Sequence, residues 1–85
     1  MKDFIVTITD SLGIHARPAG MLVKEAKKYQ STITLATGSK TGDAKKIFAV
    51  MALGVKKSEK VKVMVEGSDE ELAAAAMKSF FQENF

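Results

Sequence analysis

Three segments of the chain alternate apolar and polar residues with the period of two that half-buried β-strands have. They lie at residues 4–8, 32–35 and 61–65. Residues 38–42, Gly-Ser-Lys-Thr-Gly, are rich in turn formers and leave room for a short edge strand. The pattern therefore predicts four strands, the third of them short.

Apolar residues at helical spacing lie between these strands. Pro18 is in the first turn of the first expected helix, where its missing N–H costs no hydrogen bond. The apolar stripe of that helix has members at i, i+3, i+4 and i+7, namely Ala19, Leu22, Val23 and Ala26.

Two further helices are expected. The first has Asp43 as its N-cap, runs to about Leu53 and ends with Gly54 at the C′ position. The second begins at a capping box over residues 68–71, Ser-Asp-Glu-Glu, with acidic side chains at the positive end of the helix dipole. Its expected buried face consists of Leu72, Ala75, Ala76, Ser79 and Phe80.

The element order βαββαβα predicts a single α+β domain over residues 1–85. Three helices on one face of a four-stranded, mainly antiparallel sheet make a two-layer architecture. The other face of the sheet carries Thr and Lys side chains and can meet water. Eighty-five residues is near the lower end of the length that folds without disulfides or bound metal.

The composition excludes several kinds of chemistry. With no Cys, the chain has no disulfide, no thiolate nucleophile and no sulfur ligands, and its single His cannot build a His-based metal site. No apolar run approaches the ~18–20 residues of a membrane span, and the first residues do not resemble a secretory signal. We therefore expect a soluble, cytoplasmic protein without a metal or an organic cofactor. A monomer is the default expectation, and a strand-exchanged dimer is the alternative in a fold with edge strands.

Charge is unevenly distributed along the chain. Between residues 12 and 62, eleven basic residues stand against three acidic ones, whereas the remainder has two basic and seven acidic residues. A basic face of this kind suits acidic proteins, nucleic acid or phosphate, and a solvated surface of mixed charge is the alternative. Nucleic-acid binding is disfavoured because residues 33–35 and 61–65 carry no aromatic side chain for base stacking, and the chain has no GxxG clamp.

The candidate chemistry is concentrated in residues 13–19, Gly-Ile-His-Ala-Arg-Pro-Ala. His15 follows a glycine turn and precedes a helix whose first backbone N–H groups, at Ala16 and Arg17, have no helical partner. Those groups, the helix dipole and the Arg17 guanidinium all favour a phosphate. A neutral imidazole here can attack phosphorus, which makes His15 a candidate nucleophile for phosphoryl transfer. The alternative is a capping or surface histidine without chemistry, and the residues alone favour neither.

This heptapeptide resembles the active-site signature of HPr, the histidine phosphocarrier of the bacterial phosphotransferase system. Residues 45–54 resemble the second-helix motif of that family. Residues 61–72 resemble its last strand and the acidic entry to its final helix. The resemblance covers essentially the whole chain and implies the open-faced β-sandwich of the family.

The resemblance also implies roles for individual residues. His15 is expected to accept a phosphoryl group on Nδ1 from enzyme I and to pass it to the IIA component of a sugar permease. Arg17 is expected to stabilise the phosphate, together with the backbone N–H groups of Ala16 and Arg17. The protein is then a stoichiometric carrier and not an enzyme, and phosphoenolpyruvate is used by enzyme I rather than bound here.

The second helix carries more apolar residues than one side can bury. At 100° per residue, Val50 and Leu53 lie on one arc. The other arc holds Ile47, Phe48 and Met51. If the first arc faces the sheet, the second is an exposed patch that suits docking of partner proteins, and the alternative is that Ile47 and Met51 pack under a loop. The expected basic rim of this patch consists of Arg17, Lys24, Lys27, Lys45 and Lys46.

Two positions depart from the family pattern. Many HPr proteins of low-GC Gram-positive bacteria carry a regulatory serine where this chain has Lys46, so a role in catabolite repression is not expected unless Ser39 substitutes. Leu12 stands where some members have a polar residue, which removes a side-chain hydrogen bond to the phosphohistidine. A regulatory paralogue that acts mainly by protein binding is the alternative function, and the presence of His15 without the regulatory serine argues against it.

Overall fold

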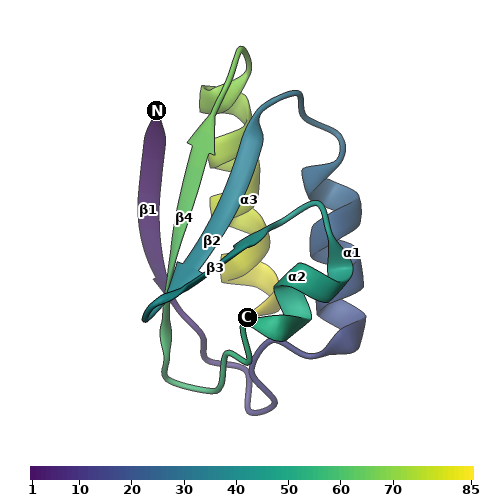
Figure 1. Cartoon of the computed structure of the whole chain (residues 1–85), viewed down its shortest axis with the longest axis vertical. Helices are drawn as coiled ribbons and strands as arrows, with labels where there is room; N and C mark the ends of the chain where they lie inside the picture. Colours follow the sequence, from purple (N-terminus) through teal and green to yellow (C-terminus); the bar gives the residue numbers. More distant parts are fainter.

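The computed structural model describes all of residues 1–85 and places four strands in one antiparallel sheet (Figure 1). The strands are β1 (Lys2–Thr7), β2 (Thr32–Thr37), β3 (Lys40–Asp43) and β4 (Lys60–Glu66), in the order β1-β4-β2-β3. The helices are α1 (Ala16–Ala26), α2 (Ile47–Ala52) and α3 (Glu70–Asn84). The predicted order βαββαβα and the α+β sandwich are thus confirmed.

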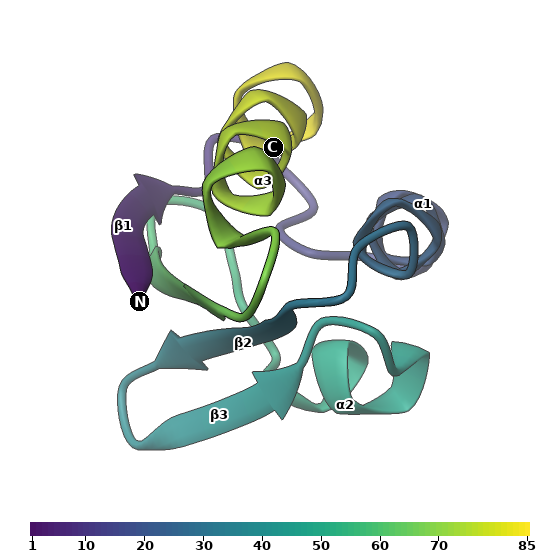
Figure 2. The same cartoon turned by 90° about the horizontal axis from the view of Figure 1, so that it is seen from above.

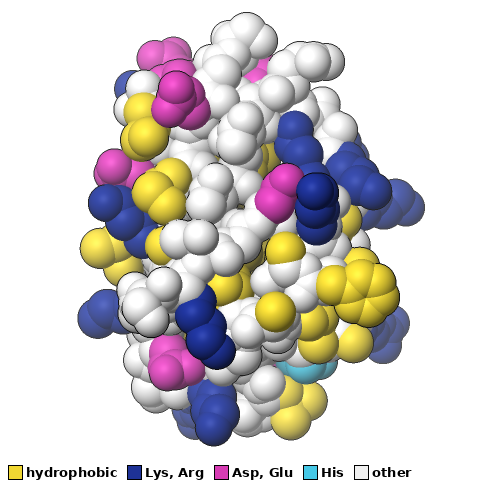
Figure 3. Space-filling view, viewed as in Figure 1, with side chains coloured by type: hydrophobic (Ala, Val, Ile, Leu, Met, Phe, Trp, Pro, Cys, Tyr) yellow, Lys and Arg dark blue, Asp and Glu magenta, His cyan; other side chains and the backbone are white.

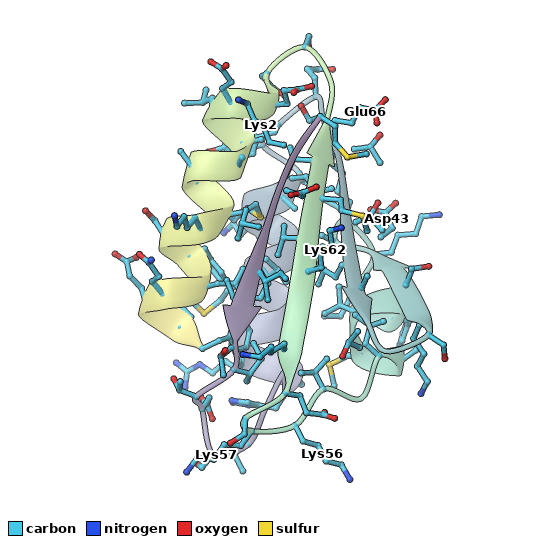
Figure 4. All side chains as sticks on the ribbon, turned by 90° about the vertical axis from the view of Figure 1, so that its left-hand side faces the viewer. Lys2, Asp43, Lys56, Lys57, Lys62 and Glu66 are labelled. Atoms are coloured by element: carbon cyan, nitrogen blue, oxygen red, sulfur yellow. The ribbon has the colours of Figure 1, made fainter.

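The helices lie on one face of the sheet and leave the other face open. Figure 2 shows α3 and α1 on one side of the sheet, with α2 next to the end of β3. In β4, Val61, Val63 and Val65 are fully buried under the helices, whereas Lys60 and Lys62 are exposed. Figure 4 looks onto the open face, on which Lys62 lies.

Side chains from every helix meet those of the sheet in one apolar core. Leu22 of α1, Val50 of α2 and Met77 of α3 are almost completely buried. Ile33 and Leu35 of β2 are buried with them. The stripe predicted for α1 is buried in full, because its members follow the 3.6-residue repeat of the helix.

The buried face predicted for α3 is wrong. The residues that face the core are Ala73, Met77 and Phe81. The predicted residues, which are exposed or only partly buried, are Leu72, Ala75, Ala76, Ser79 and Phe80. Residues 73–76 are all Ala, so an apolar stripe can be drawn on several sides of this helix. Both sides also carry large apolar side chains, and packing against the sheet buries Met77 and Phe81 and leaves Leu72 exposed.

The start of α2 also differs from the prediction, whereas its end agrees. Asp43 belongs to β3, where it pairs with Thr34, and its carboxylate accepts from the N–H of Lys45 at 2.8 Å. The N-cap residue of α2 is Lys46, since the chain stays extended through Asp43 and turns only afterwards. Gly54 has the left-handed φ of 61° expected of a C′ glycine.

The capping box predicted over residues 68–71 is not formed. The N-cap residue of α3 is Asp69, one residue later than the box requires. The side chain that reaches back is that of Glu70, which accepts from the N–H of Gly67 at 3.2 Å. The Asp69 carboxylate makes no capping bond because it is used elsewhere.

Asp69 connects α3 to the turn between α1 and β2. Its carboxylate accepts from the N–H groups of Gln30 and Ser31, both at 2.9 Å, and from the Ser31 hydroxyl. Ser31 is fully buried, so these bonds satisfy polar groups that have lost water. The Ser31 hydroxyl, and after it the Gln30 N–H, hold the pKa of Asp69 below its ordinary value.

Asp69→Asn is expected to lower the thermal unfolding midpoint near neutral pH, because its NH2 group would face donors of the turn. A lowered pKa stabilises the native state above the ordinary Asp value of about 3.9, and that stabilisation is lost as the pH falls through the lowered pKa. The midpoint of the wild type should therefore fall more steeply on acidification than that of the variant, as measured by thermal melts from neutral to acidic pH. Glu83→Gln, at an exposed acid of the same helix, should follow the wild type. Parallel pH profiles for Asp69→Asn and the wild type would contradict this assignment.

Candidate functional site

His15 is the N-cap residue of α1. Its backbone is extended (φ −110°, ψ 175°), its carbonyl accepts from the N–H of Ala19 at 3.0 Å, and its imidazole is partly exposed. The N–H groups of Ala16 and Arg17 precede the first bond of the helix and have no protein partner. The structure thus brings an imidazole, two free N–H groups and the exposed Arg17 side chain to one helix end. Such an end attracts anions.

Gly13 shapes the loop that leads to His15. It has a left-handed φ of 67°, and its N–H donates to the carbonyl of Asp10 at 2.9 Å. The N–H of Ile14 donates to the carbonyl of Val55 at 3.0 Å, so the loop lies against the segment that follows α2. A Cβ at position 13 would collide with that carbonyl oxygen, and the position therefore requires glycine.

Asp10 contacts His15, although spacing along the chain did not predict this. Oδ2 of Asp10 lies 3.5 Å from Nε2 of His15, and Oδ1 accepts from the N–H of Leu12 at 2.8 Å. The Leu12 N–H, and to a lesser extent His15, hold the pKa of Asp10 below its ordinary value. A turn pattern in the sequence could have identified Asp10. It precedes Gly13 by three residues, which is typical of an Asp whose side chain accepts from the backbone N–H two residues later.

The helix α2 has one buried and one exposed side, as its predicted arcs require. Val50 and Leu53 are buried in the core. Phe48 is 85% exposed, Met51 is 37% exposed, and Ile47 is partly buried. Figure 3 shows hydrophobic side chains on the same side of the molecule as the single histidine, with Lys and Arg side chains near them.

Leu12 and Met21 are two further exposed apolar side chains. Leu12 is 69% exposed in the loop before His15, and Met21 is exposed on α1. Met21 follows Arg17 by four residues, so helical spacing places both on the solvent side of α1. That spacing could have identified Met21, which lies outside the buried stripe. We call the exposed side of α2, formed by Ile47, Phe48 and Met51, the apolar patch.

Most of the residues expected to form the basic rim are exposed, and Lys45 is the exception. Lys24 and Lys27 are exposed on α1, and Lys46 is exposed at the N-cap of α2. Lys45 is partly buried, because its Nζ donates to the carbonyl of Tyr29 at 2.8 Å. Lys45 therefore connects the start of α2 to the end of α1 in addition to contributing positive charge.

None of the three helices combines the length and the apolar character that crossing a membrane requires. No three side chains of His, Cys, Asp or Glu come together in an arrangement that could hold a metal ion.

Known proteins provide an independent comparison. Residues 2–83 match a family model described as the PTS HPr component phosphorylation site. The chain belongs to the HPr family. HPr proteins are phosphocarriers of the phosphotransferase system, and the fold implied by the resemblance is the one observed.

Individual members of the HPr family are similar over nearly their whole length. The phosphocarrier protein HPr of Mycoplasma capricolum is 41% identical over 78 residues, which cover 92% of this chain and 88% of the relative. That of Mycoplasma genitalium is 40% identical over 85 residues, which cover 99% and 97%. The solved structure of a histidine-containing phosphocarrier protein from Mycoplasma has a TM-score of 0.94 at 38% identity, with 96% of this chain and 93% of that chain covered.

Gly13→Ala is expected to lower the thermal unfolding midpoint by about 10 °C, because positive φ disfavours an L-residue and the added methyl group collides with the carbonyl of Val55. Gly20→Ala is the matched control. Gly20 is exposed within α1 and has open space around it, so this change should raise the midpoint slightly. Thermal melts of both variants check the expectation, and equal effects at the two positions would contradict it.

Proposed function

We propose that this protein accepts a phosphoryl group on His15 from enzyme I and passes it to the IIA components of sugar permeases. The observation that carries the proposal is a partly exposed histidine at a helix N-cap, beside two free N–H groups and an arginine, in a member of the HPr family. The protein acts as a stoichiometric carrier, as a monomer in the cytoplasm, and needs no cofactor of its own.

The groups at the N-terminus of α1 have distinct roles in phosphoryl transfer. The lone pair of Nδ1 of His15 attacks phosphorus, and the N–H groups of Ala16 and Arg17 donate to the phosphoryl oxygens. The Arg17 guanidinium is a permanently charged, forked donor that matches two phosphate oxygens. Because Arg17 and the imidazole are both accessible, the next partner can approach the phosphohistidine and remove its phosphoryl group.

Enzyme I and the IIA components dock on the apolar patch. Exposed Phe and Met side chains are adaptable anchors for different partners. Lys24, Lys27 and Lys46 attract acidic partner surfaces, which accelerates association more than it strengthens the complex. A carrier must dock, transfer and leave, and a small apolar anchor with a charged rim suits that task.

Lys46 argues against a regulatory function. It has no hydroxyl group to phosphorylate, and its charge adds to the positive end of the helix dipole of α2. A regulatory paralogue, of the nitrogen-branch or catabolite-control type, is therefore the less favoured alternative. Growth distinguishes the two, because a carrier restores growth on a transported sugar to a strain that lacks its other phosphocarriers, whereas a binding-only paralogue does not.

Incubation with purified enzyme I and labelled phosphoenolpyruvate is expected to attach an acid-labile, base-stable label, which is typical of phosphohistidine. His15→Ala should abolish the label, because the imidazole is the acceptor. Arg17→Gly should slow labelling by about tenfold, since a charged donor to the phosphate is lost. It should leave the fold intact, with only the small fall in the thermal midpoint that a glycine in the first turn of α1 causes.

Two outcomes of this experiment would count against the proposal. Wild-type protein that takes up no label from enzyme I of several sources would exclude the carrier function. Unfolding of Arg17→Gly would show that Arg17 is a structural residue, because its exposed side chain should contribute little to the fold.

Phe48→Ala is expected to weaken the binding of enzyme I by about tenfold and to change the thermal midpoint little, because the ring is almost fully exposed. Titration calorimetry and thermal melts measure the two effects. Leu72→Ala removes a similarly exposed apolar side chain from α3 and should change neither quantity. Equal losses of binding and stability in Phe48→Ala, or a loss of binding in Leu72→Ala, would contradict docking on the apolar patch.

A further inference from the structure

Asp10 faces the ring nitrogen of His15 that does not attack phosphorus. We propose that Asp10 is a positioning residue, which holds a proton on Nε2 and so leaves the lone pair of Nδ1 free for the transfer. The inference rests on the proposed function, because it assigns a second residue to the site of phosphoryl transfer. It concerns which of two neutral forms the imidazole adopts before any partner arrives.

The two oxygens of the Asp10 carboxylate have different partners. Oδ1 accepts from the N–H of Leu12 at 2.8 Å, and Oδ2 lies 3.5 Å from Nε2 of His15. An ionised carboxylate can only accept hydrogen bonds, so this contact favours the ring form with its proton on Nε2. In that form Nδ1 carries the lone pair, which points away from Nε2 in the plane of the ring.

Asp10 is held in place by backbone bonds on both sides. Its N–H donates to the carbonyl of Phe85 at 3.0 Å, and its carbonyl accepts from the N–H of Gly13 at 2.9 Å. The Phe85 carbonyl also accepts from the N–H and the hydroxyl of Thr9. Phe85 is buried, and its ring centroid lies 5.3 Å from that of Phe81. The carboxylate therefore belongs to a loop anchored in the core, which keeps it close to the imidazole.

The charge of Asp10 also acts during the transfer. As the Nδ1 lone pair forms the N–P bond, the bond between phosphorus and its leaving group on the donor breaks, and that electron pair stays with the donor. The Nε2 proton stays on the ring, which becomes positively charged and faces the Asp10 carboxylate at 3.5 Å. When an acceptor takes the phosphoryl group, the electron pair of the N–P bond returns to Nδ1 and the ring is neutral again.

Asp10→Asn tests this role because it keeps the turn and changes the group that faces His15. The amide oxygen can accept from the N–H of Leu12, and the NH2 group then faces Nε2 and favours a lone pair there. Nitrogen-15 NMR of the neutral imidazole should show more of the form with its proton on Nδ1 than in the wild type. Labelling by enzyme I should slow by about tenfold, because that form has no lone pair on Nδ1.

Two further variants complete the experiment. Asp43→Asn is the matched control, since Asp43 makes the same kind of turn bond, to the N–H of Lys45 at 2.8 Å, before α2. It should leave the NMR signals of His15 and the labelling rate unchanged. Asp10→Ser retains an oxygen that can accept from the Leu12 N–H but is too short to reach Nε2. Its ring populations should lie between those of the wild type and Asp10→Asn.

The outcomes separate this inference from the proposed function. The same proportions of the two ring forms in the wild type and both Asp10 variants would overturn the role of Asp10, whatever the labelling rates. If the backbone NMR spectrum shows that Asp10→Asn is unfolded, the proportions of the two ring forms in Asp10→Ser and the wild type decide whether Asp10 has this role. If the wild type takes up no label from enzyme I, the proposed function fails, while NMR of the free protein still decides whether Asp10 holds the proton on Nε2 of His15.

Discussion

The close approach of residues 13 and 14 to the segment after α2 is the contact on which the site depends. Only a glycine can adopt the left-handed turn and lie against the carbonyl of Val55, and the N–H of Ile14 then bonds that carbonyl. The left-handed turn at Gly13 and the hydrogen bond from Ile14 to Val55 together fix where α1 begins. The start of α1 in turn fixes the positions of His15 and of the free N–H groups. The geometry of the candidate site is therefore set by a backbone contact in which neither the imidazole nor the Arg17 guanidinium takes part.

The same segment links the site to the apolar patch. One side of α2 places Val50 and Leu53 in the core, which holds the helix in a fixed position. The other side presents Phe48 to water, where the ring adds little to the stability of the isolated domain. Val55, two residues after Leu53, receives the loop that carries His15. Nine consecutive residues, 47–55, thus both carry the exposed side chains of α2 and support the loop that holds the imidazole.

Local periodicity predicted most of the fold, and it failed where local information was insufficient. The alternation in β4 and the stripe of α1 depend only on neighbours in the chain, and both agree with the structure. In α3 four consecutive alanines made the stripe ambiguous, so packing against distant residues decided it. Asp69 accepts from N–H groups that lie 38 and 39 positions earlier in the chain. No local pattern indicates which distant N–H group a carboxylate will contact. His15 and Arg17 could be found because both lie at the start of one helix.

The place of β4 in the sheet has a consequence for the order in which the site is assembled. β4 lies between β1 and β2, which do not pair with each other, so a growing chain cannot join these two strands until residues 60–66 have been made. The loop around His15 also needs the carbonyls of Val55 and Phe85. His15 is therefore synthesised before the residues that hold its loop in place. A nascent chain that has emerged only as far as α2 contains the histidine but not the site.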